Sequence, residues 1–263
     1  MKLRLDKLLL DRGIVPSRER AQALILAGRV LVNEQKVEKP GTQITPDAQI
    51  KLLGDDLRYV SRGGLKLERA LQHWKIDLNG RSCMDVGAST GGFTDCMLQH
   101  GAARVLAIDT GYGQIDNRLR QDPRVSLLER TNARYLEESQ LQFAVDFFAM
   151  DVSFISATLV LPAVLAAIRR RLTPQAEFQG VILVKPQLEA GREAIGKGGI
   201  VRNEAFRLAA VERVRKAVEE HGGSGLDVID SPILGAEGNR EFLLSTQFTD
   251  RITSVCGSLL TSL

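Results

Sequence analysis

Apolar residues follow two different patterns along the chain, and each pattern predicts its own kind of structure. Near the front, the leucines of residues 5–9 repeat at helical spacing, and Ser17 is a suitable N-cap for a second helix that runs to Gly28. Two short apolar runs follow, at residues 30–32 and 36–37, with a polar turn between them. This is the pattern of a β-hairpin, so the front segment is predicted to form a small α+β unit.

From Arg81 onward, short apolar runs typical of buried strands alternate with longer helical stretches. Each predicted strand leads to a polar residue: Cys83–Met84 to Asp85, Val105–Ile108 to Asp109, Val125–Leu128 to Asn132, Phe147–Met150 to Asp151, and Val181–Val184 to Lys185. The main helical stretches are Phe93–His100, Ile155–Leu172 and Glu204–His221. This alternation predicts a parallel sheet covered by helices, in which ligands bind at the carboxyl edge, where the polar residues fall.

The end of the chain breaks this alternation. Residues 226–230 and 240–248 are strand-like runs with no helix between them, so they should pair antiparallel. Such an ending is unusual in dinucleotide-dependent enzymes and is expected of the S-adenosylmethionine-dependent methyltransferase fold. The predicted fold class is therefore α/β: a Rossmann-like methyltransferase sheet with a terminal antiparallel hairpin, preceded by the small α+β domain.

A polar segment that ends in two glycines, residues 55–64, marks the boundary between the front segment and the strand–helix alternation that follows it. Leu65, Leu67 and Trp74 then share a helical pattern on which Lys66 falls. The predicted organisation is a first domain at residues 1–58, a linker at 59–64, a second domain at 65–250 and a C-terminal tail at 251–263.

Composition and charge narrow the classes of partner. The 263 residues are 44% hydrophobic and 25% charged, as in ordinary globular proteins. Residues 1–75 hold 15 Lys and Arg against nine Asp and Glu, although the whole chain carries only +3. A basic front segment on a mildly acidic body indicates a polyanionic partner.

Two features indicate the cytoplasm. The three cysteines form no CxxC pair and no metal-binding spacing with the three histidines, so we predict buried thiols in a reducing compartment and no metal. The chain begins without a secretory signal, and its longest apolar stretch, residues 157–168, is too short to span a bilayer. We therefore expect no stable membrane association.

The sequence MDVGASTGGF at residues 84–93 predicts a strand, a glycine turn and a helix that Thr90 or Thr94 could cap. The spacing fits neither the dinucleotide fingerprint nor the phosphate-binding loop, so a pyrophosphate site is not indicated. The residues expected to contact a nucleoside cofactor are Gly87, Ser89, Gly91 and Gly92. The alternative is a tight strand-to-helix connection that binds nothing.

Three polar residues could complete the cofactor site. Asp109 follows the second strand, about 20 residues after the glycine turn. A carboxylate at this place can accept hydrogen bonds from the ribose hydroxyls of either NAD or S-adenosylmethionine. Asn132 could read an adenine edge, or could simply cap a turn. Asp85 is expected to order the glycine loop or to reach the cofactor amino group through water.

The basic front segment closely resembles the RNA-binding domain first described in ribosomal protein S-four. The resemblance covers about 50 residues and is carried by the segment from Arg4 to Ile44. The resemblance implies binding to structured RNA through Arg4, Lys7, Arg12, Arg18, Arg20 and Arg29. Asp6 is expected to be a local ion-pair residue and not a catalytic one. From charge alone, the alternative is a solvated helix face.

The second domain resembles the FtsJ-like ribose methyltransferases, whose Lys-Asp-Lys-Glu tetrad matches the segments SRGGLK, MDVSF, LVKP and GNRE. The catalytic candidates are therefore Lys66, Asp151, Lys185 and Glu241. With the front domain and the segments DVSFIS and VKPQLEAGRE, the whole chain is similar to the TlyA family, also called hemolysin A. This resemblance implies S-adenosylmethionine as cofactor and ribosomal RNA as substrate. The run DVSF differs from the DMAP-like run of FtsJ proper, which leaves the target preference open.

Such a tetrad suits methyl transfer to a ribose 2′-hydroxyl. An alcohol is a poor nucleophile that must be oriented in line with the methyl group and must lose its proton as the new bond forms. We assign Lys185 as the base or hydroxyl-orienting residue, Asp151 as its partner, and Lys66 and Glu241 as positioning and electrostatic groups.

Two alternatives stay open on the sequence alone. An NAD-dependent oxidoreductase would share the first half of the fold, but the glycine spacing and the terminal hairpin disfavour it. A membrane-active protein is suggested by the hemolysin name, but no segment has the basic polar face and bulky aromatic apolar face that insertion into a membrane surface favours.

Overall fold

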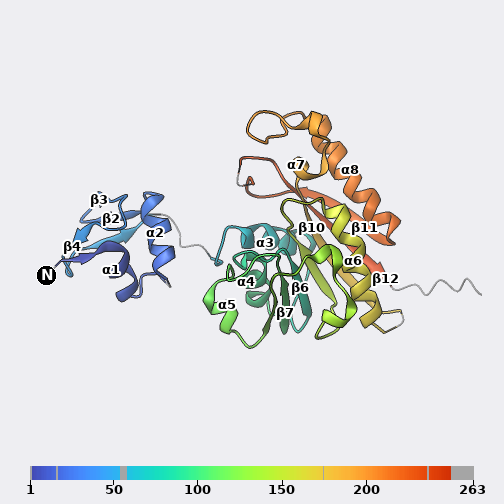
Figure 1. Ribbon diagram of the computed structural model, residues 1–263, viewed down its shortest axis with the longest axis horizontal. Coiled ribbons are helices and arrows are strands. Elements are labelled where there is room, and N and C mark those ends of the chain that lie inside the picture. Colours follow the sequence, from blue (N-terminus) through green and yellow to red (C-terminus); the bar gives the residue numbers. More distant parts are fainter. Residues whose placement is uncertain (1, 16, 54–57, 174, 236, 250–263) are drawn as a thin grey trace, which may run out of the picture. The chain divides into compact units, whose positions relative to one another are not determined.

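The computed structural model describes residues 2–15, 17–53, 58–173, 175–235 and 237–249. The chain divides into two compact units, Met1–Arg58 and Tyr59–Leu263 (Figure 1). Each unit has its own hydrophobic core. The predicted tail at 251–263, including Cys256, lies outside the described residues.

The first unit packs two helices against short strands. The helices are α1 (Leu5–Asp11) and α2 (Arg18–Leu26), and the Ser17 side chain caps α2 by accepting a hydrogen bond from the Arg20 N–H. The strands are β1 (Leu3–Arg4), β2 (Val30–Val32), β3 (Gln35–Lys36), β4 (Gln43–Ile44) and β5 (Ile50–Leu52), all paired antiparallel. The predicted helices and hairpin are confirmed.

The second unit is built on a seven-stranded sheet of order β11-β12-β10-β9-β6-β7-β8. Its strands are β6 (Ser82–Val86), β7 (Arg104–Ile108), β8 (Val125–Leu128), β9 (Phe147–Met150), β10 (Glu177–Val184), β11 (Gly223–Asp230) and β12 (Phe242–Thr249). Strands β6 to β10 run parallel to their neighbours within this set, whereas β12 is antiparallel to both β10 and β11. The predicted parallel sheet with an antiparallel ending is confirmed.

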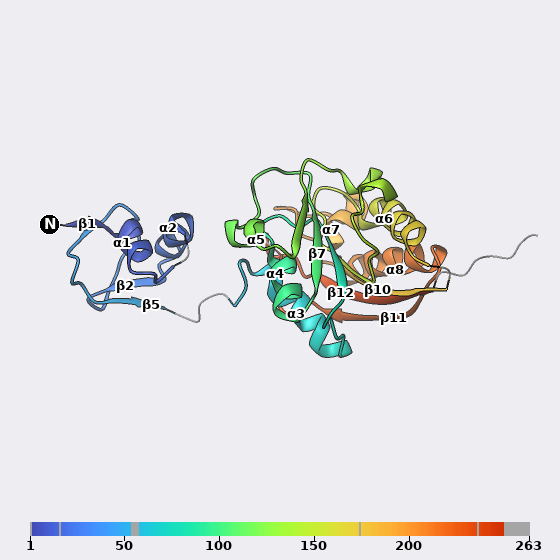
Figure 2. The same ribbon diagram turned by 90° about the horizontal axis from the view of Figure 1, so that it is seen from below.

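Helices cover both faces of this sheet (Figure 2). One face packs against α3 (Gly63–Trp74) and α4 (Gly92–Gln99), and the other against α6 (Ala157–Arg171) and α8 (Glu204–Glu220). The two-residue period of a strand explains the division: in β6, Met84 joins the α6–α8 core and its neighbour Cys83 joins the α3–α4 core.

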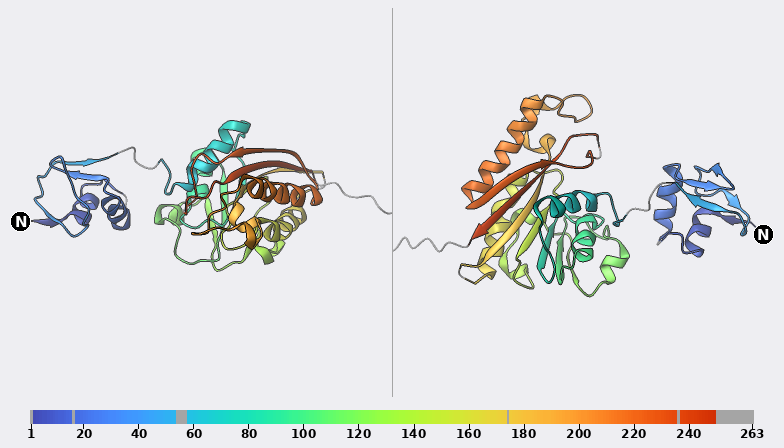
Figure 3. Two further views of the ribbon diagram at one scale, coloured as in Figure 1. Left: turned by 90° about the horizontal axis from the view of Figure 1, so that it is seen from above. Right: turned by 180° about the vertical axis from the view of Figure 1, so that it is seen from behind.

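Shorter elements complete the unit. They are α5 (Asn117–Gln121), α7 (Pro186–Glu189) and three 3₁₀ turns at Ala133–Tyr135, Glu138–Gln140 and Arg192–Ala194. Because the parallel strands end at one edge, the loops that follow them converge there (Figure 3). Strand β12 begins at that same edge, since Phe242 pairs with Val184, the last residue of β10.

Two sequence predictions are wrong in detail. Strand β6 extends through Asp85 to Val86, so Asp85 lies inside the strand and is fully buried. The segment 59–64 is not a linker, because the Tyr59 side chain is 2% exposed within the α3–α4 core and α3 already begins at Gly63.

Candidate active site

Asp85 organises the start of the glycine loop from inside β6. Its Oδ2 accepts hydrogen bonds from the Thr94 N–H at 2.8 Å and the Thr94 Oγ1–H at 2.6 Å. The carboxylate therefore fulfils at α4 the role that the sequence assigned to Thr90 or Thr94, since the N-cap residue, Gly91, has no side chain. Burial raises the pKa of Asp85 to about 7, and the nearby Asp151 and Asp109 carboxylates add to the effect, while the Thr94 hydrogen bonds oppose it.

The glycines bring the loop against other parts of the protein. At Gly87, where φ is +91°, a Cβ atom would lie 2.4 Å from the Asp151 carbonyl oxygen. At Gly92, a Cβ would lie 2.3 Å from Ser61 Oγ and 2.9 Å from the Gly64 nitrogen. Close approach of backbone is thus what these two positions require, and it joins the loop to the end of β9 and the start of α3.

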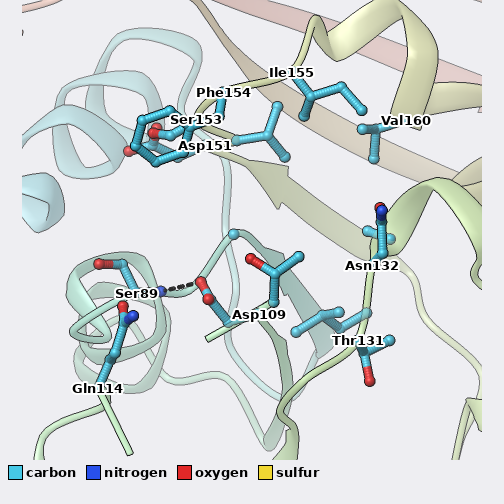
Figure 4. A pocket seen from close by; sticks show the side chains of 15 residues that line it. Ser89, Asp109, Gln114, Thr131, Asn132, Asp151, Ser153, Phe154, Ile155 and Val160 are labelled. Carbon is cyan, nitrogen blue, oxygen red and sulfur yellow. Dashed lines mark hydrogen bonds between the residues drawn. The ribbon is translucent and has the colours of Figure 1, made fainter. Parts of the chain in front are cut away.

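A cavity of about 220 Å³ opens at the carboxyl edge of the sheet, beside this loop. Figure 4 shows Asp109, Ser89 and Gln114 on one side, Asp151, Ser153 and Phe154 across from them, and Asn132 on a third side. The polar residues predicted to follow β7, β8 and β9 therefore line one cavity.

Asp109 is held in a single orientation in this cavity. Its Oδ2 accepts from the Ser89 N–H at 2.8 Å, and its Oδ1 accepts from the Gly111 N–H at 2.6 Å. Each carboxylate oxygen keeps a further lone pair that can accept a hydroxyl from a ligand. Asn132 Oδ1 accepts from the Arg134 N–H and so caps the 3₁₀ turn at Ala133–Tyr135, the role that the sequence left open beside adenine recognition.

The four tetrad residues form two shielded ion pairs. Lys185 Nζ lies 2.6 Å from Asp151 Oδ1, and the two side chains are 10% and 21% exposed. Lys66 Nζ lies 2.6 Å from Glu241 Oε2, and these side chains are 10% and 3% exposed. The structure thus pairs each lysine with one carboxylate.

The sheet register explains why residues far apart in sequence meet. Lys185 follows Val184, and Glu241 precedes Phe242, the pairing partner of Val184. Asp151 follows β9, which is the other neighbour of β10. Pro186 then occupies the first turn of α7, where its fixed φ turns the chain directly behind Lys185.

A second cavity, of about 320 Å³, adjoins the first. Lys66 lines it together with the loop around Gly92, and the two cavities share Gly87, Ser89 and Asp151. Of the four paired residues, Asp151 therefore lies where the two cavities meet, and Lys66 lines the second cavity. A ligand in the first cavity and a second reactant in the other would both reach Asp151. Gly91 lines neither cavity; its Cβ position lies against Leu119, so we explain this glycine by packing.

Sequence reasoning missed two polar residues of the site. Ser153 Oγ accepts a hydrogen bond from Lys185 Nζ at 2.9 Å. Asn239 is buried and holds the segment before α8, because its Oδ1 accepts from the Val201 N–H and its Nδ2 donates to the Gly199 carbonyl. The sequence did offer a signal for Ser153, which is a hydroxyl residue two positions after a predicted catalytic aspartate. Nothing in the sequence indicated the hydrogen bond between Asn239 and Val201, which are 38 residues apart.

In the first unit, two of the predicted RNA-binding residues bind a buried carboxylate through their side chains. Asp6 is fully buried and accepts hydrogen bonds from the Arg4 and Arg18 guanidinium groups and from Gln22. The Arg4 hydrogen bonds are the largest cause of a pKa for Asp6 far below its usual range. The expectation that Asp6 is an ion-pair residue is confirmed.

The other predicted residues of this set lie around the same unit. Lys7 is exposed, and its backbone N–H donates to Asp6. The Arg12 guanidinium donates to the Ala48 and Pro46 carbonyls, and Arg29 Nε donates to the Leu53 carbonyl at 2.8 Å. Arg20 follows the α2 cap and is half-buried. These contacts order the side chains and leave Arg12 exposed to solvent.

Comparison with known families identifies both units. Residues 59–248 match the FtsJ-like methyltransferase model, and residues 3–50 match the S4 domain. The chain belongs to the FtsJ-like methyltransferase family. The family assignment decides the fold class and favours methyl transfer over the oxidoreductase alternative.

Several relatives of this methyltransferase match over most of their length. The 16S/23S rRNA (cytidine-2′-O)-methyltransferase TlyA of Mycobacterium tuberculosis is 42% identical over 97% of this chain and 94% of that protein. Hemolysin A of Brachyspira hyodysenteriae is 38% identical over 92% of this chain and 98% of its own. A solved structure from Streptococcus thermophilus, described provisionally as a hemolysin, is 43% identical, with a TM-score of 0.72 over 95% of this chain and 89% of that one. The predicted resemblance to the TlyA family is confirmed.

Three features of the described ranges concern membranes, metals and thiols. No helix there combines the length and apolarity needed to cross a membrane. Among the same residues, no group of His, Cys, Asp and Glu side chains could hold a metal ion. Cys83 and Cys96 are buried, and neither forms a disulfide bond among the described residues.

Proposed function

We propose that this enzyme transfers the methyl group of S-adenosylmethionine to a ribose 2′-hydroxyl of structured RNA, with ribosomal RNA as the natural substrate. One observation carries the proposal. Asp151, from one of two shielded lysine–carboxylate pairs, lines the same cavity as the fixed strand-end carboxylate Asp109, and Lys66, from the other pair, lines the adjoining cavity. The names of the TlyA relatives support the choice of ribose and of ribosomal RNA. Such a substrate would place the enzyme in the cytoplasm, without stable membrane association.

The residues present suit the cofactor. The free lone pairs of Asp109 can accept the two ribose hydroxyls, while the backbone bonds from Ser89 and Gly111 keep the carboxylate in place. Gly87 and Ser89 would line the path from the first cavity to the second. Asn132 would lie near the base. When bound, S-adenosylmethionine supplies an electrophilic methyl carbon on a sulfonium sulfur.

The protein supplies orientation and a proton acceptor. Lys185 would bind the 2′-hydroxyl and accept its proton as the new oxygen–carbon bond forms, and Asp151 would keep the amine in place. Lys66, fixed by Glu241, would contribute a positive charge to the second cavity, where an RNA phosphate or the developing alkoxide can be stabilised. The shielding of both pairs from water strengthens these interactions.

The first unit would recruit the RNA. Lys7 and Arg12 are exposed, and Arg4 and Arg18 are each about half exposed although they bind Asp6. Cations ordered by a buried anion can contact phosphates with little further loss of side-chain freedom.

The test is transfer of labelled methyl from S-adenosylmethionine to purified ribosomal RNA or subunits. We expect label in RNA, and binding of S-adenosylmethionine but not of NAD by calorimetry. Preference for NAD, or absence of label with every ribosomal substrate, would contradict the proposal. Leakage of liposomes on addition of the purified protein alone would favour the membrane-active alternative instead.

A further inference from the structure

Lys185 has one contact that the four-residue tetrad does not include. Its ammonium group can donate three hydrogen bonds. One goes to Ser153 Oγ at 2.9 Å, and the ammonium group also forms an ion pair with Asp151 Oδ1 at 2.6 Å. These two contacts restrict the directions of the remaining N–H groups, or of the lone pair that replaces one of them when the proton is lost.

We infer that Ser153 is a positioning residue for methyl transfer: its hydroxyl holds Lys185 in the orientation in which the lysine receives the substrate hydroxyl. The inference rests on the proposed function and deepens it. Ser153 need not touch the reacting atoms. It acts by restricting an otherwise flexible four-carbon side chain.

The placement of Ser153 supports this role. It lies two residues after Asp151 in the loop that leaves β9, and both side chains line the cavity of Asp109 (Figure 4). The next residue, Phe154, has a φ of +67°, a left-handed conformation that is strained for a side-chain-bearing residue. The loop thus keeps a costly backbone geometry directly beside the Lys185 contact.

A hydroxyl and a carboxylate do different things for a lysine that changes charge. The Asp151 contact is strongest while Lys185 is an ammonium ion, because it is then charge-assisted. The Ser153 oxygen is a neutral acceptor and can bind an N–H of either the ammonium or the free amine. It therefore keeps the nitrogen oriented while the 2′-hydroxyl proton moves to it. In this step the free amine of Lys185 would take the hydroxyl proton and become an ammonium ion. The ribose oxygen would form its bond to the methyl carbon while the methyl–sulfur bond of the donor breaks, leaving a neutral thioether.

The experiment compares Ser153→Ala, which removes the acceptor, with Ser153→Thr, which keeps it. Single-turnover methyl transfer is measured with S-adenosylmethionine and ribosomal RNA both saturating. We expect Ser153→Ala to lower the rate by about 10–100-fold, the scale of a misplaced reacting group, while both dissociation constants stay within about twofold. Ser153→Thr should recover most of the rate. Ser224→Ala, on the edge strand β11, is a matched control outside the site and should match the wild type.

Each other outcome is decisive. A wild-type rate for Ser153→Ala, beside a slow Lys185→Ala, would overturn the inference and leave the proposed function intact. Weakened cofactor binding or a lower unfolding midpoint in Ser153→Ala, without recovery by Ser153→Thr, would show a merely structural role and would also overturn it. If the wild-type enzyme transferred no methyl group to RNA, the proposed function itself would fail.

Discussion

The two units hold their charged clusters in opposite ways. In the first, the anion Asp6 is fully buried, while the arginines that bind it, Arg4 and Arg18, are 46% and 49% exposed. In the second, both members of each pair are shielded, as in Lys185 with Asp151. The first cluster exposes cations that a buried carboxylate holds in place, and the second keeps its ionic groups away from water.

This difference fits two different tasks. Exposed cations can bind phosphates, and their attraction depends on salt because mobile ions screen it. Shielded pairs are screened less and keep a defined geometry, which is what an in-line transfer requires. On this contrast rests our proposal that the first unit supplies RNA affinity and the second supplies the chemistry.

The largest expected effect comes from breaking a shielded pair. Lys185→Ala should lower the methyl-transfer rate by about 10²–10⁴, the usual contribution of a positioned acid or base. The affinity for S-adenosylmethionine should stay nearly unchanged, because Asp109 and the glycine loop are untouched. Lys185→Arg should recover little, since a guanidinium group does not give up its proton. Single-turnover kinetics with both substrates saturating, beside calorimetry of cofactor binding, measure the two effects.

The second prediction separates the units. A chain that begins at Arg58 keeps both cores of the second unit and should still bind the cofactor. Its RNA affinity should fall, and the slope of log affinity against log salt should become shallower by roughly 0.7–0.9 for each lost phosphate contact. Filter binding at several salt concentrations measures this. If the RNA affinity and its salt dependence were both unchanged, the second unit would recruit the RNA. The two units would then not divide the tasks as proposed.

The third prediction concerns the cofactor carboxylate. Asp109→Ala removes the acceptor of the Ser89 and Gly111 backbone bonds as well as the proposed ribose contact. The affinity for S-adenosylmethionine should weaken by about 1–3 kcal/mol. Calorimetry on the variant, with circular dichroism as a check of folding, is the measurement. A folded variant with full affinity would refute the assignment of Asp109.

The smallest effect tests a buried carboxylate that lacks cationic partners. Asp85, unlike Asp6, has a raised pKa of about 7 against an ordinary 3.8. The folded state therefore holds this proton more tightly than the unfolded state does. The contribution of this proton to the free energy of unfolding is therefore largest below about pH 4. The contribution falls as the pH rises and is lost as the pH passes through about 7.

Asp85→Asn isolates this contribution, because the amide cannot titrate. Relative to the variant, the wild type should lose about 1 kcal/mol of unfolding free energy between pH 6 and pH 7. Urea unfolding of both proteins at the two pH values measures the difference. A difference that does not change with pH, or one that grows in favour of the wild type, would mean that Asp85 is already ionised below pH 6.

Local patterns were enough to predict most elements of both units. The limits of β8 and β9 agree with the predicted runs, because charged residues bound each run on both sides. Asp85 was misplaced for the same reason: a carboxylate inside a strand looks like the end of the strand, and only its contact with Thr94 reveals otherwise. Tyr59 likewise stood among polar residues and glycines, although it is buried.

The members of the candidate site were predictable, but only one of its two pairings was. The four tetrad residues were located by resemblance, and the predicted pairing of Lys185 with Asp151 is present in the structure. The pairing of Lys66 with Glu241, which is 175 residues away in sequence, was not predicted. Such a pairing depends on strand register, and sequence spacing does not encode it. The Ser153 contact depends in the same way on how the loop after β9 turns.

The central claim is that the methyl group goes to a ribose 2′-oxygen, and the position of the label tests it most directly. RNA methylated by the purified enzyme is hydrolysed in alkali, which cleaves only where a free 2′-hydroxyl can attack the neighbouring phosphate. We predict labelled methyl in alkali-resistant dinucleotides, absent when Lys185→Ala replaces the wild type. Label released in mononucleotides, which would place the methyl group on a base, would contradict the account.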